Sequence, residues 1–518
     1  MPDSGVLPAG ILPVAARARQ APAMRLFVPE LALRNMMLGS CLVAVLFYPM
    51  YAGVSLWLGI GVALTVMVMW HALSASRTVP WLPGLTAGTA CVQWIMAPWL
   101  SYGLGSTVAT ATLQRMAISA PEYFAYAVPV TLALVAGLYL PLSRRVRHQW
   151  NASDADRMSR SLRITCEFMV IGGLILRYLI PFAPTSLRFA VLLLAQLSYV
   201  GAFALVLGRV RGWVWRVAAV MLLETYYNTI DAQFLDLMLW GMFLAALLIY
   251  RFRPRPRTLV VSGIVATIFL LALNIMKLEY REVLRTTNVA AIDRPAVAAQ
   301  AFAEALASPS ALLVGQNLAI NTGRLNQGWI ISRVMIWVPE SEPFARGETI
   351  LSSIRAALLP RILDPGKATA GGFANLPRFT GLTLIGGTSM NLGMAGEMYA
   401  NFGRERAVFA VFVYGIALGS LFAMFVRWSR QSPLWWAWAP MVIFTTISAE
   451  MSTTEVFNHI TKAFAIMLAV TTVIPSWALL RRWKLQRQIA RIATRRRERG
   501  VNRAAMPLTA SVADRERS

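Results

Sequence analysis

Seven basic side chains lie between residues 320 and 380, and together they suit an anionic ligand. They are Arg324, Arg333, Arg346, Arg355, Arg361, Lys367 and Arg378. The planar guanidinium group of arginine binds phosphate or pyrophosphate through two parallel hydrogen bonds. Acidic residues of the same stretch offer the alternative of internal ion pairs: Glu340, Glu342, Glu348 and Asp364. Anion binding and ion pairing both fit the spacing.

A second group of ionisable residues lies at the ends of apolar stretches. Its members are Arg177, Arg188, Glu224, Asp231, Asp236, Glu450, His459 and Lys462. A charge inside a bilayer is costly, so such residues are candidates for function. The alternative for each is a side chain that reaches the lipid headgroups or pairs with a neighbour. As a group, they predict a polar cavity at one face of a membrane.

Metal and nucleotide chemistry have little support in the sequence. Asp154-Ala-Asp156 resembles the Asp-x-Asp metal site of nucleotide-sugar transferases, but its loop is too short for that catalytic domain. No HExxH or GxxxxGK motif occurs. The histidines are too far apart to predict a metal site by spacing: His71, His148 and His459. We therefore expect neither a cofactor nor a metal.

The elements that must position these residues are membrane helices. The chain of 518 residues is 57% hydrophobic and only 14% charged, whereas a soluble protein is about a quarter charged. A spanning helix needs roughly 20 apolar residues and pairs all its backbone groups internally. The pattern predicts an all-α, polytopic membrane protein with about twelve transmembrane helices. Their expected ranges are 31–52, 53–73, 80–103, 125–142, 162–183, 186–208, 212–228, 230–250, 257–276, 405–426, 434–451 and 459–480.

The distribution of charge predicts the orientation of the chain. The net charge of +25 comes from Lys and Arg clusters in alternate connections, such as residues 143–163 and 251–257. This pattern differs from the single basic patch that binds nucleic acid. Basic connections stay in the cytoplasm, so we expect both termini there and a bacterial inner membrane as the location. The basic tail suits an interfacial helix or a topology anchor followed by disordered chain.

The predicted topology divides the chain into five parts. A cytoplasmic segment (1–30) precedes a membrane domain of about nine spans (31–276), a large periplasmic loop (277–404), about three more spans (405–480) and a basic cytoplasmic tail (481–518). Loops of that length are uncommon unless they are functional. Three stretches of the loop have the period of short helices: PAVAAQAFAEALA, LNQGWIISRVMIW and ARGETILSSIRAALLP. We therefore expect a partly helical loop that carries function.

Two further stretches of this loop carry a resemblance to a known family. In LLPRILDPGKA (358–368), Pro360-Arg361 precedes Pro365-Gly366-Lys367. In GGTSMNLGMAGEMYANFG (386–403), Gly396-Glu397 leads through Tyr399 to Asn401-Phe402-Gly403. Both resemble the periplasmic loop of Wzy-type polymerases of polysaccharide repeat units, closely over about 50 residues and elsewhere as a hydropathy profile. The pairs Arg361 and Gly372, and Arg355 and Gly366, also match the Arg and Gly that ten residues separate in some members.

The resemblance implies a membrane glycosyltransferase with a GT-C-like arrangement of helices. Such an enzyme polymerises polyprenyl-pyrophosphate-linked oligosaccharides at the periplasmic face, for exopolysaccharide, capsule or O-antigen. An acceptor hydroxyl attacks the anomeric carbon of the donor, and polyprenyl pyrophosphate leaves. This chemistry needs a base near the hydroxyl and cations near the leaving group. The resemblance offers Glu397 or His459 as the base, and Arg361 with Arg324, Arg333 or Arg378 as the cations.

Other residues and partners follow from the same resemblance. Arg355 and Lys367 join the substrate-binding residues, while Tyr399 and Asn401 either orient sugar hydroxyls or pack a helix. The expected partners are polyprenyl-pyrophosphate-linked glycans, the lipid bilayer, and a chain-length regulator and flippase of the same pathway, with no nucleic acid. The alternatives are an O-antigen ligase-like transferase, which shares the donor and the outer-face site, and a flippase, transporter or scaffold without catalysis.

Overall fold

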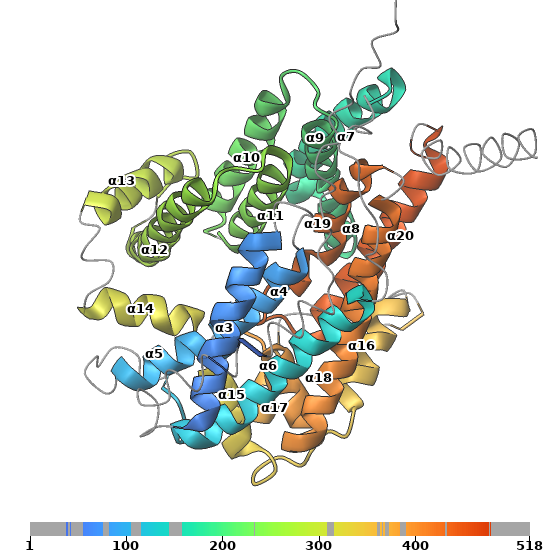
Figure 1. Cartoon of the computed structure of the whole chain (residues 1–518). Helices are drawn as coiled ribbons and strands as arrows, with labels where there is room; N and C mark the ends of the chain where they lie inside the picture. Colours follow the sequence, from blue (N-terminus) through green and yellow to red (C-terminus); the bar gives the residue numbers. More distant parts are fainter. Residues whose placement is uncertain are drawn as a thin grey trace, which may run out of the picture.

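A computed structural model describes much of the chain and is helical throughout the part that it describes. The described residues are 38–39, 42, 55–75, 82–104, 115–143, 158–232, 234–287, 289–307, 315–359, 363–364, 366–367, 372–383, 390–429, 432–475 and 477. Every regular element within these ranges is a helix, and none is a strand (Figure 1). The expected all-α class is therefore confirmed.

Seven helices in the described residues are long and apolar enough to cross a membrane. They are Ala120–Leu142, Arg160–Phe182, Leu187–Leu207, Leu235–Phe252, Arg257–Thr286, Gly393–Ser429 and Thr453–Val473. The chain is accordingly an α-helical polytopic membrane protein. The total of twelve spans stays a prediction, since most of the first expected span, 31–52, lies outside the described residues.

Two expected spans take a broken form. The span expected at 80–103 consists of α4 (Leu82–Cys91), a π-helical turn η1 (Val92–Met96) and α5 (Ala97–Leu104). The span expected at 434–451 consists of the short helices η6 (Pro433–Ala437), α19 (Ala439–Ile443) and η7 (Phe444–Thr446). These short helices are buried. Irregular backbone at membrane depth is tolerated where protein surrounds it, and this explains why a continuous helix is not required there.

The closest packing joins α6 (Ala120–Ser143) to α18 (Gly393–Ser429). A Cβ atom on Gly137 of α6 would lie 2.4 Å from the carbonyl oxygen of Phe412, and one on Gly419 would lie 2.3 Å from that of Leu138. Gly415 and Gly419 form a GxxxG pair on α18, a spacing that lets two membrane helices approach closely. These glycines therefore fix the distance between the two helices.

A neighbouring group of helices follows in sequence. It contains α7 (Arg160–Leu179), α8 (Thr185–Ala195), α9 (Leu197–Leu207), α10 (Trp213–Ile230) and α11 (Leu235–Phe252). The helices α7 and α9 pack directly on each other. Between α9 and α11, the rings of Tyr199 and Trp240 stack with centroids 3.8 Å apart. Large side chains such as Phe168 and Trp215 remain exposed, as lipid-facing residues do.

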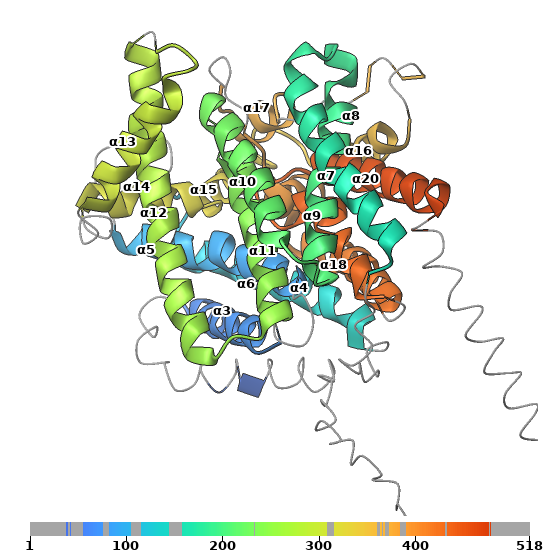
Figure 2. The ribbon, with the colours of Figure 1, turned by 90° about the horizontal axis from the view of Figure 1, so that it is seen from above.

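The helix α12 (Pro256–Thr286) extends ten residues beyond its expected end at 276. The following α13 (Arg294–Ala307) packs back on it, and α14 (Gly315–Leu325) also contacts α12. In both views, α12 and α13 lie at one edge of the molecule and α20 (Thr453–Val473) lies toward the other (Figure 2). Part of the expected loop is thus a continuation of a membrane helix.

The rest of the expected loop folds against α18 and α20. It contains α15 (Gly328–Trp337), α16 (Glu348–Leu358) and α17 (Asn375–Thr380). The three helices expected from periodicity coincide with α13, α15 and α16 and are confirmed. The helix α16 lies beside both α18 and α20 (Figure 1). The helix α18 is broken at Gly403, where φ is 71° and ψ is −176°. Its first part, which carries Glu397, therefore belongs with the loop helices.

Candidate functional site

Glu397 is a buried carboxylate that joins α18 to the start of α20. It is 1% exposed. One carboxylate oxygen accepts a hydrogen bond from the Thr453 hydroxyl at 2.6 Å, and the other accepts one from the Thr453 backbone N–H at 2.9 Å. The first N–H groups of a helix lack acceptors within the helix. Glu397 accepts a hydrogen bond from one of these groups, the N–H of Thr453. Its carboxylate is therefore held by two bonds in one orientation.

The start of α20 is capped by its own residues as well. The Ser452 hydroxyl accepts from the backbone N–H of Glu455 at 3.3 Å, and the Glu455 carboxylate accepts from the backbone N–H of Ser452 at 3.3 Å. This reciprocal pattern is a capping box. The sequence Ser452-Thr-Thr-Glu455 carries the signal for it, and it could have shown that α20 starts six residues before the expected 459.

A chain of hydroxyl groups continues from Glu397 into α16. The Ser353 hydroxyl lies 2.9 Å from the Thr453 hydroxyl and 2.7 Å from the Thr454 hydroxyl, and it donates to the Thr349 carbonyl at 2.7 Å. These groups are buried. These hydroxyls could not be predicted as a group from the sequence, because Ser and Thr are common and nothing in their spacing predicts contacts across a hundred residues.

Asn401 ties the first part of α18 to the segment before α16. Its Nδ2 donates to the Thr349 hydroxyl at 2.7 Å and to the Glu397 backbone carbonyl at 2.8 Å. Its Oδ1 accepts from the Gly347 backbone N–H at 2.9 Å. Both ends of the amide are thus engaged by protein groups. Of the two roles expected for Asn401, its contacts match packing of a helix.

A polar cavity of about 490 Å³ opens beside this network. Pockets of this size hold small ligands, with a few polar groups fixing their orientation. Its uncharged polar residues are Thr349, Ser352, Asn375, Asn391, Ser452 and Thr454, and its charged residues are Glu348, Lys367, Arg378 and Glu397. Hydroxyl, amide and carboxylate groups of this lining are suited to the hydroxyl groups of a sugar.

Arg378, which lines the cavity, forms ion pairs with two carboxylates. Its Nη1 and Nη2 bind both carboxylate oxygens of Glu348 at 3.0 and 3.1 Å, and its Nε binds Glu342 at 2.6 Å. The hydrogen bond from Arg378 lowers the pKa of Glu348, and hydrogen bonds from Glu348 and Glu342 raise the pKa of Arg378. Arg378, one of the cations expected to bind pyrophosphate, therefore lines the cavity. It also forms the internal ion pairs that were the alternative to anion binding.

Lys367 and Arg355 hold the end of α16. The Lys367 ammonium donates to the Ala356 carbonyl at 2.9 Å and to the Leu359 carbonyl at 2.8 Å. Cations are favourable at a helix C-terminus, where carbonyls lack partners. Arg355 pairs with Asp364 at 2.7 Å. Lys367 lines the cavity, whereas Arg355 is not among its lining residues.

The remaining predicted cations lie elsewhere. Arg333, on α15, is exposed, and its Nε donates to the Thr380 carbonyl at 3.4 Å. Arg324 is in the last turn of α14 and is also exposed. Neither lines the cavity beside Glu397. Arg361, the first cation proposed for pyrophosphate, lies outside the described residues.

The two aromatic candidates are separate from this cavity. The Tyr399 ring packs edge-on against Tyr126 at 5.1 Å between centroids. The His459 ring is buried, its Nε2 lies 2.8 Å from the Met441 carbonyl, and its face stacks on Phe444. Neither residue lines the cavity. The structure thus brings together Glu397, Arg378 and Lys367 but not His459 or Tyr399.

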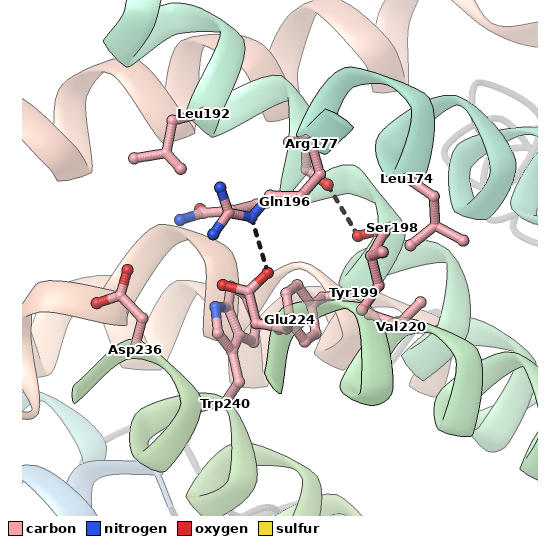
Figure 3. A pocket seen from close by; sticks show the side chains of 12 residues that line it. Leu174, Arg177, Leu192, Gln196, Ser198, Tyr199, Val220, Glu224, Asp236 and Trp240 are labelled. Atoms are coloured by element: carbon pink, nitrogen blue, oxygen red, sulfur yellow. Dashed lines mark hydrogen bonds and ion pairs between the residues drawn. The ribbon is translucent and has the colours of Figure 1, made fainter. Parts of the chain in front are cut away.

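Three of the charged residues at the ends of the spans line a pocket that shares no lining residue with the cavity beside Glu397. Arg177, Glu224 and Asp236 line a small pocket of about 20 Å³ among α7, α10 and α11 (Figure 3). Arg177 Nε binds Glu224 at 3.1 Å, and Asn228 donates to the other oxygen of Glu224 at 2.9 Å. This volume is close to the space that one water molecule occupies. The pocket therefore holds an ion pair and has no room for a sugar.

Glu450 belongs to a third location, near the π-helical turn. Its carboxylate accepts from Gln327 Nε2 at 3.1 Å and from the Ser448 hydroxyl at 3.2 Å. The π-turn places Gln93 so that its backbone carbonyl accepts from the Gln327 N–H at 3.1 Å and its side-chain oxygen accepts from the Ala449 N–H at 3.0 Å. These bonds connect the broken span to α15 and to the segment before α20.

Comparison with known proteins finds no relative of this chain. None of the protein-family models, curated proteins or solved structures that were compared matches the chain. Function is therefore argued from the site and from the resemblance in its sequence.

Proposed function

We propose that the chain is a membrane glycosyltransferase that polymerises polyprenyl-pyrophosphate-linked oligosaccharide repeat units. The observation that supports this best is the cavity of about 490 Å³ in which a fixed carboxylate, Glu397, lies with hydroxyl and amide side chains and with Arg378 and Lys367. The acceptor glycan requires a base such as this carboxylate, and the leaving pyrophosphate requires cations. The two stretches that resemble Wzy-type polymerases contribute residues to the same cavity.

The proposed reaction forms one bond and breaks one. An acceptor hydroxyl oxygen bonds to the anomeric carbon of the donor, and the bond from that carbon to the pyrophosphate oxygen breaks. The pyrophosphate leaves with the electron pair, and the base takes the proton of the acceptor. A carboxylate offers about four acceptor positions, and Thr453 uses two of those on Glu397. We assign the base to Glu397, with capacity left for the acceptor hydroxyl.

His459 is the weaker choice for the base. Its Nε2 is engaged by the Met441 carbonyl, and aromatic rings of Phe189 and Phe444 flank it. A base needs to lie within about 3 Å of the proton that it removes. Because His459 does not line the cavity, an acceptor held there would not reach it.

The cations of the cavity are assigned to the leaving group. Arg378 and Lys367 line it, and charge on pyrophosphate grows as the bond breaks. Arg378 is tied to two carboxylates, so the position of its guanidinium is set before the substrate arrives. Arg361 remains part of the proposal on its place in the sequence alone.

The location belongs to the proposal as well. On the distribution of Lys and Arg, both termini are cytoplasmic, the membrane is the bacterial inner membrane, and the cavity faces the periplasm. A chain-length regulator and a flippase would then act with this protein. The helices supply the bilayer contact that such a lipid-linked donor requires.

Deletion of the gene in its host tests this function. A lost polymerase leaves single repeats that are still exported or attached, and the polysaccharide ladder on a gel collapses to its shortest band. A lost ligase leaves long lipid-linked chains and an undecorated acceptor, and a lost flippase leaves repeats on the cytoplasmic side. Long chains that persist unchanged would refute the proposal.

A pair of variants sharpens that test. Glu397→Gln removes the proposed base, whereas Glu304→Gln changes an exposed carboxylate on α13 that does not line the cavity. At equal protein level in the membrane, we expect no polymer with the first variant and polymer with the second. Full polymer with Glu397→Gln would remove Glu397 from the mechanism.

A further inference from the structure

The apolar part of α12 is long enough to cross the hydrocarbon core of a bilayer and to end near Lys277. Lys277 follows Pro256, the first residue of α12, by 21 positions, which is roughly 32 Å at 1.5 Å per residue. The hydrocarbon core of a bilayer is about 30 Å thick. Between the two, the side chains of Val260, Val261 and Ile264 are more than half exposed. This helix presents an apolar face to lipid, and Lys277 follows where that face ends.

Three cations gather at this end of α12. Lys277 and Arg281 are four residues apart on one face of the helix. The helix α14 packs on α12 and carries Arg324 in its last turn. Lys277 interacts electrostatically with both Arg281 and Arg324, and Arg281 interacts with Arg324. The two elements therefore bring like charges together.

Protein groups leave much of this charge unpaired. Among the described residues, neither the Lys277 ammonium nor the Arg324 guanidinium has a hydrogen bond or an ion pair. Arg281 directs Nε and Nη2 to the Ala232 carbonyl at 3.2 and 2.7 Å. Glu450 also acts on Lys277, but its oxygens already accept from Gln327 and Ser448. A positive excess remains.

Such an arrangement suits an anion with several acceptor oxygens. Like charges repel one another, and the repulsion is stronger near a bilayer than in water because the dielectric is lower. A phosphate group relieves it by accepting two bonds from a guanidinium and another from an ammonium. We propose that Lys277, Arg281 and Arg324 bind the phosphate group of a membrane lipid, whose chains lie along the exposed apolar face of α12. The proposal does not depend on the transferase activity.

Thermal unfolding of the purified full-length chain in detergent tests the site. The probes are dioleoyl phosphatidic acid, dioleoylglycerol and inorganic phosphate. The first carries both chains and phosphate, and each of the others lacks one. We expect phosphatidic acid to raise Tm saturably, by at least about 2 °C, and dioleoylglycerol to leave it unchanged.

Variants separate a ligand site from a structural role. Lys277→Gln combined with Arg324→Gln is expected to weaken phosphatidic acid binding at least about tenfold, while the lipid-free variant is as heat-stable as the original chain because repulsion is relieved. If Lys277 and Arg324 instead stabilised the fold itself, their removal would lower the Tm of the lipid-free chain. Lys277→Arg is expected to retain binding. Arg257→Gln removes the same charge at the other end of α12 and serves as the control.

The outcomes distinguish the sources of phosphate. If inorganic phosphate alone raises Tm and the double variant abolishes the effect, the three cations bind phosphate without a lipid, and the phosphate site stands while its lipid source is rejected. An unchanged affinity in the double variant, or an equal effect of dioleoylglycerol, overturns the proposal. If the double variant does not elute as a single species from a size-exclusion column, Lys277→Gln and Arg324→Gln are measured separately. Each is then expected to weaken the binding of phosphatidic acid, and an unchanged affinity in both overturns the proposal.

Discussion

Glu397 on α18 accepts two hydrogen bonds from Thr453, the residue at which α20 begins. The two residues are 56 positions apart, and one is in the expected loop region while the other starts a membrane helix. This contact orients a carboxylate that lines the cavity, and it also caps a backbone N–H at the start of α20. Structure and proposed chemistry therefore depend on one pair of residues.

Thr453→Val tests how far that pair orients the carboxylate. The variant keeps the backbone N–H but loses the hydroxyl that binds Glu397 at 2.6 Å. We expect unfolding to become easier by about 1 kcal/mol, and glycan transfer to slow about tenfold because Glu397 is less well oriented. Thr267→Val is the control, since that exposed hydroxyl bonds only its own helix. Equal transfer rates in the two variants would contradict the orienting role.

The ion pair between Arg177 and Glu224 is expected to matter for stability. Their side chains are 14% and 10% exposed, so Arg177→Gln leaves a poorly solvated carboxylate without its cation. We expect a loss of about 3 kcal/mol in the free energy of unfolding. Adding Glu224→Gln should recover part of it, since the uncompensated charge is then gone. Chemical unfolding of both single variants and the double variant measures this, and strictly additive effects would argue against the pair.

Close approach of α6 and α18 predicts a large effect from a small substitution. Gly137→Ala places a Cβ atom 2.4 Å from the Phe412 carbonyl oxygen, and we expect the helices to separate at a cost of about 1–3 kcal/mol. Gly241→Ala is the matched control, because nothing lies within 4 Å of a Cβ atom there. A gain in helix propensity of about 0.5–1 kcal/mol is expected for the control. Thermal unfolding that ranks the two variants in the opposite order would disprove this packing.

The pair of Glu348 and Arg378 predicts a dependence of stability on pH. The hydrogen bond from Arg378 lowers the pKa of Glu348. Because the folded pKa is the lower one, the pair stabilises the fold above the ordinary glutamate value of roughly pH 4.3. That contribution is lost as pH falls through the lowered value. Glu348 is 62% exposed, so the effect is small.

The difference in Tm between the original chain and Glu348→Gln measures the stabilising contribution of the pair between Glu348 and Arg378. We expect a difference at neutral pH that disappears at acid pH. Glu282→Gln is the control, since its pair with Arg285 is 3.9 Å long and largely exposed. A difference that grows toward acid pH would have the wrong sign for this pair.

Long apolar helices could be predicted from the sequence because their composition alone determines them. The ends of α7, α11 and α20 lie within seven residues of expectation, and α15 and α16 follow from apolar periodicity. The break of α18 at Gly403 lies close to the expected start of a span at 405, but the helix that precedes the break, from Gly393, was not predicted, because the stretch 386–403 is rich in glycine. The division of 434–451 into short helices likewise depends on burial around Pro440.

The candidate site was predictable by residue type but not by partner. Glu397 was expected to carry chemistry, and it does line a polar cavity with Arg378 and Lys367. The sequence could not show that Lys367 caps α16, or that Arg378 selects Glu348 and Glu342 over other acidic residues. The Arg378 pairs cross 30 or more positions and the Lys367 contacts cross 8 and 11, and all of them depend on how helices and loops pack. The cluster at Lys277 was missed because α12 runs past its apolar stretch.

The proposed activity is tested most directly with the purified chain in liposomes that contain a polyprenyl-pyrophosphate-linked oligosaccharide as both donor and acceptor. Product length is read on a gel, and released polyprenyl pyrophosphate is measured by mass spectrometry. We predict a ladder of products with one polyprenyl pyrophosphate released for each bond formed, and a rate at least about a hundredfold lower with Glu397→Gln. Intact substrate after prolonged incubation, or substrate moved across the bilayer with no new glycosidic bond, would contradict the assignment of glycan transfer to this chain.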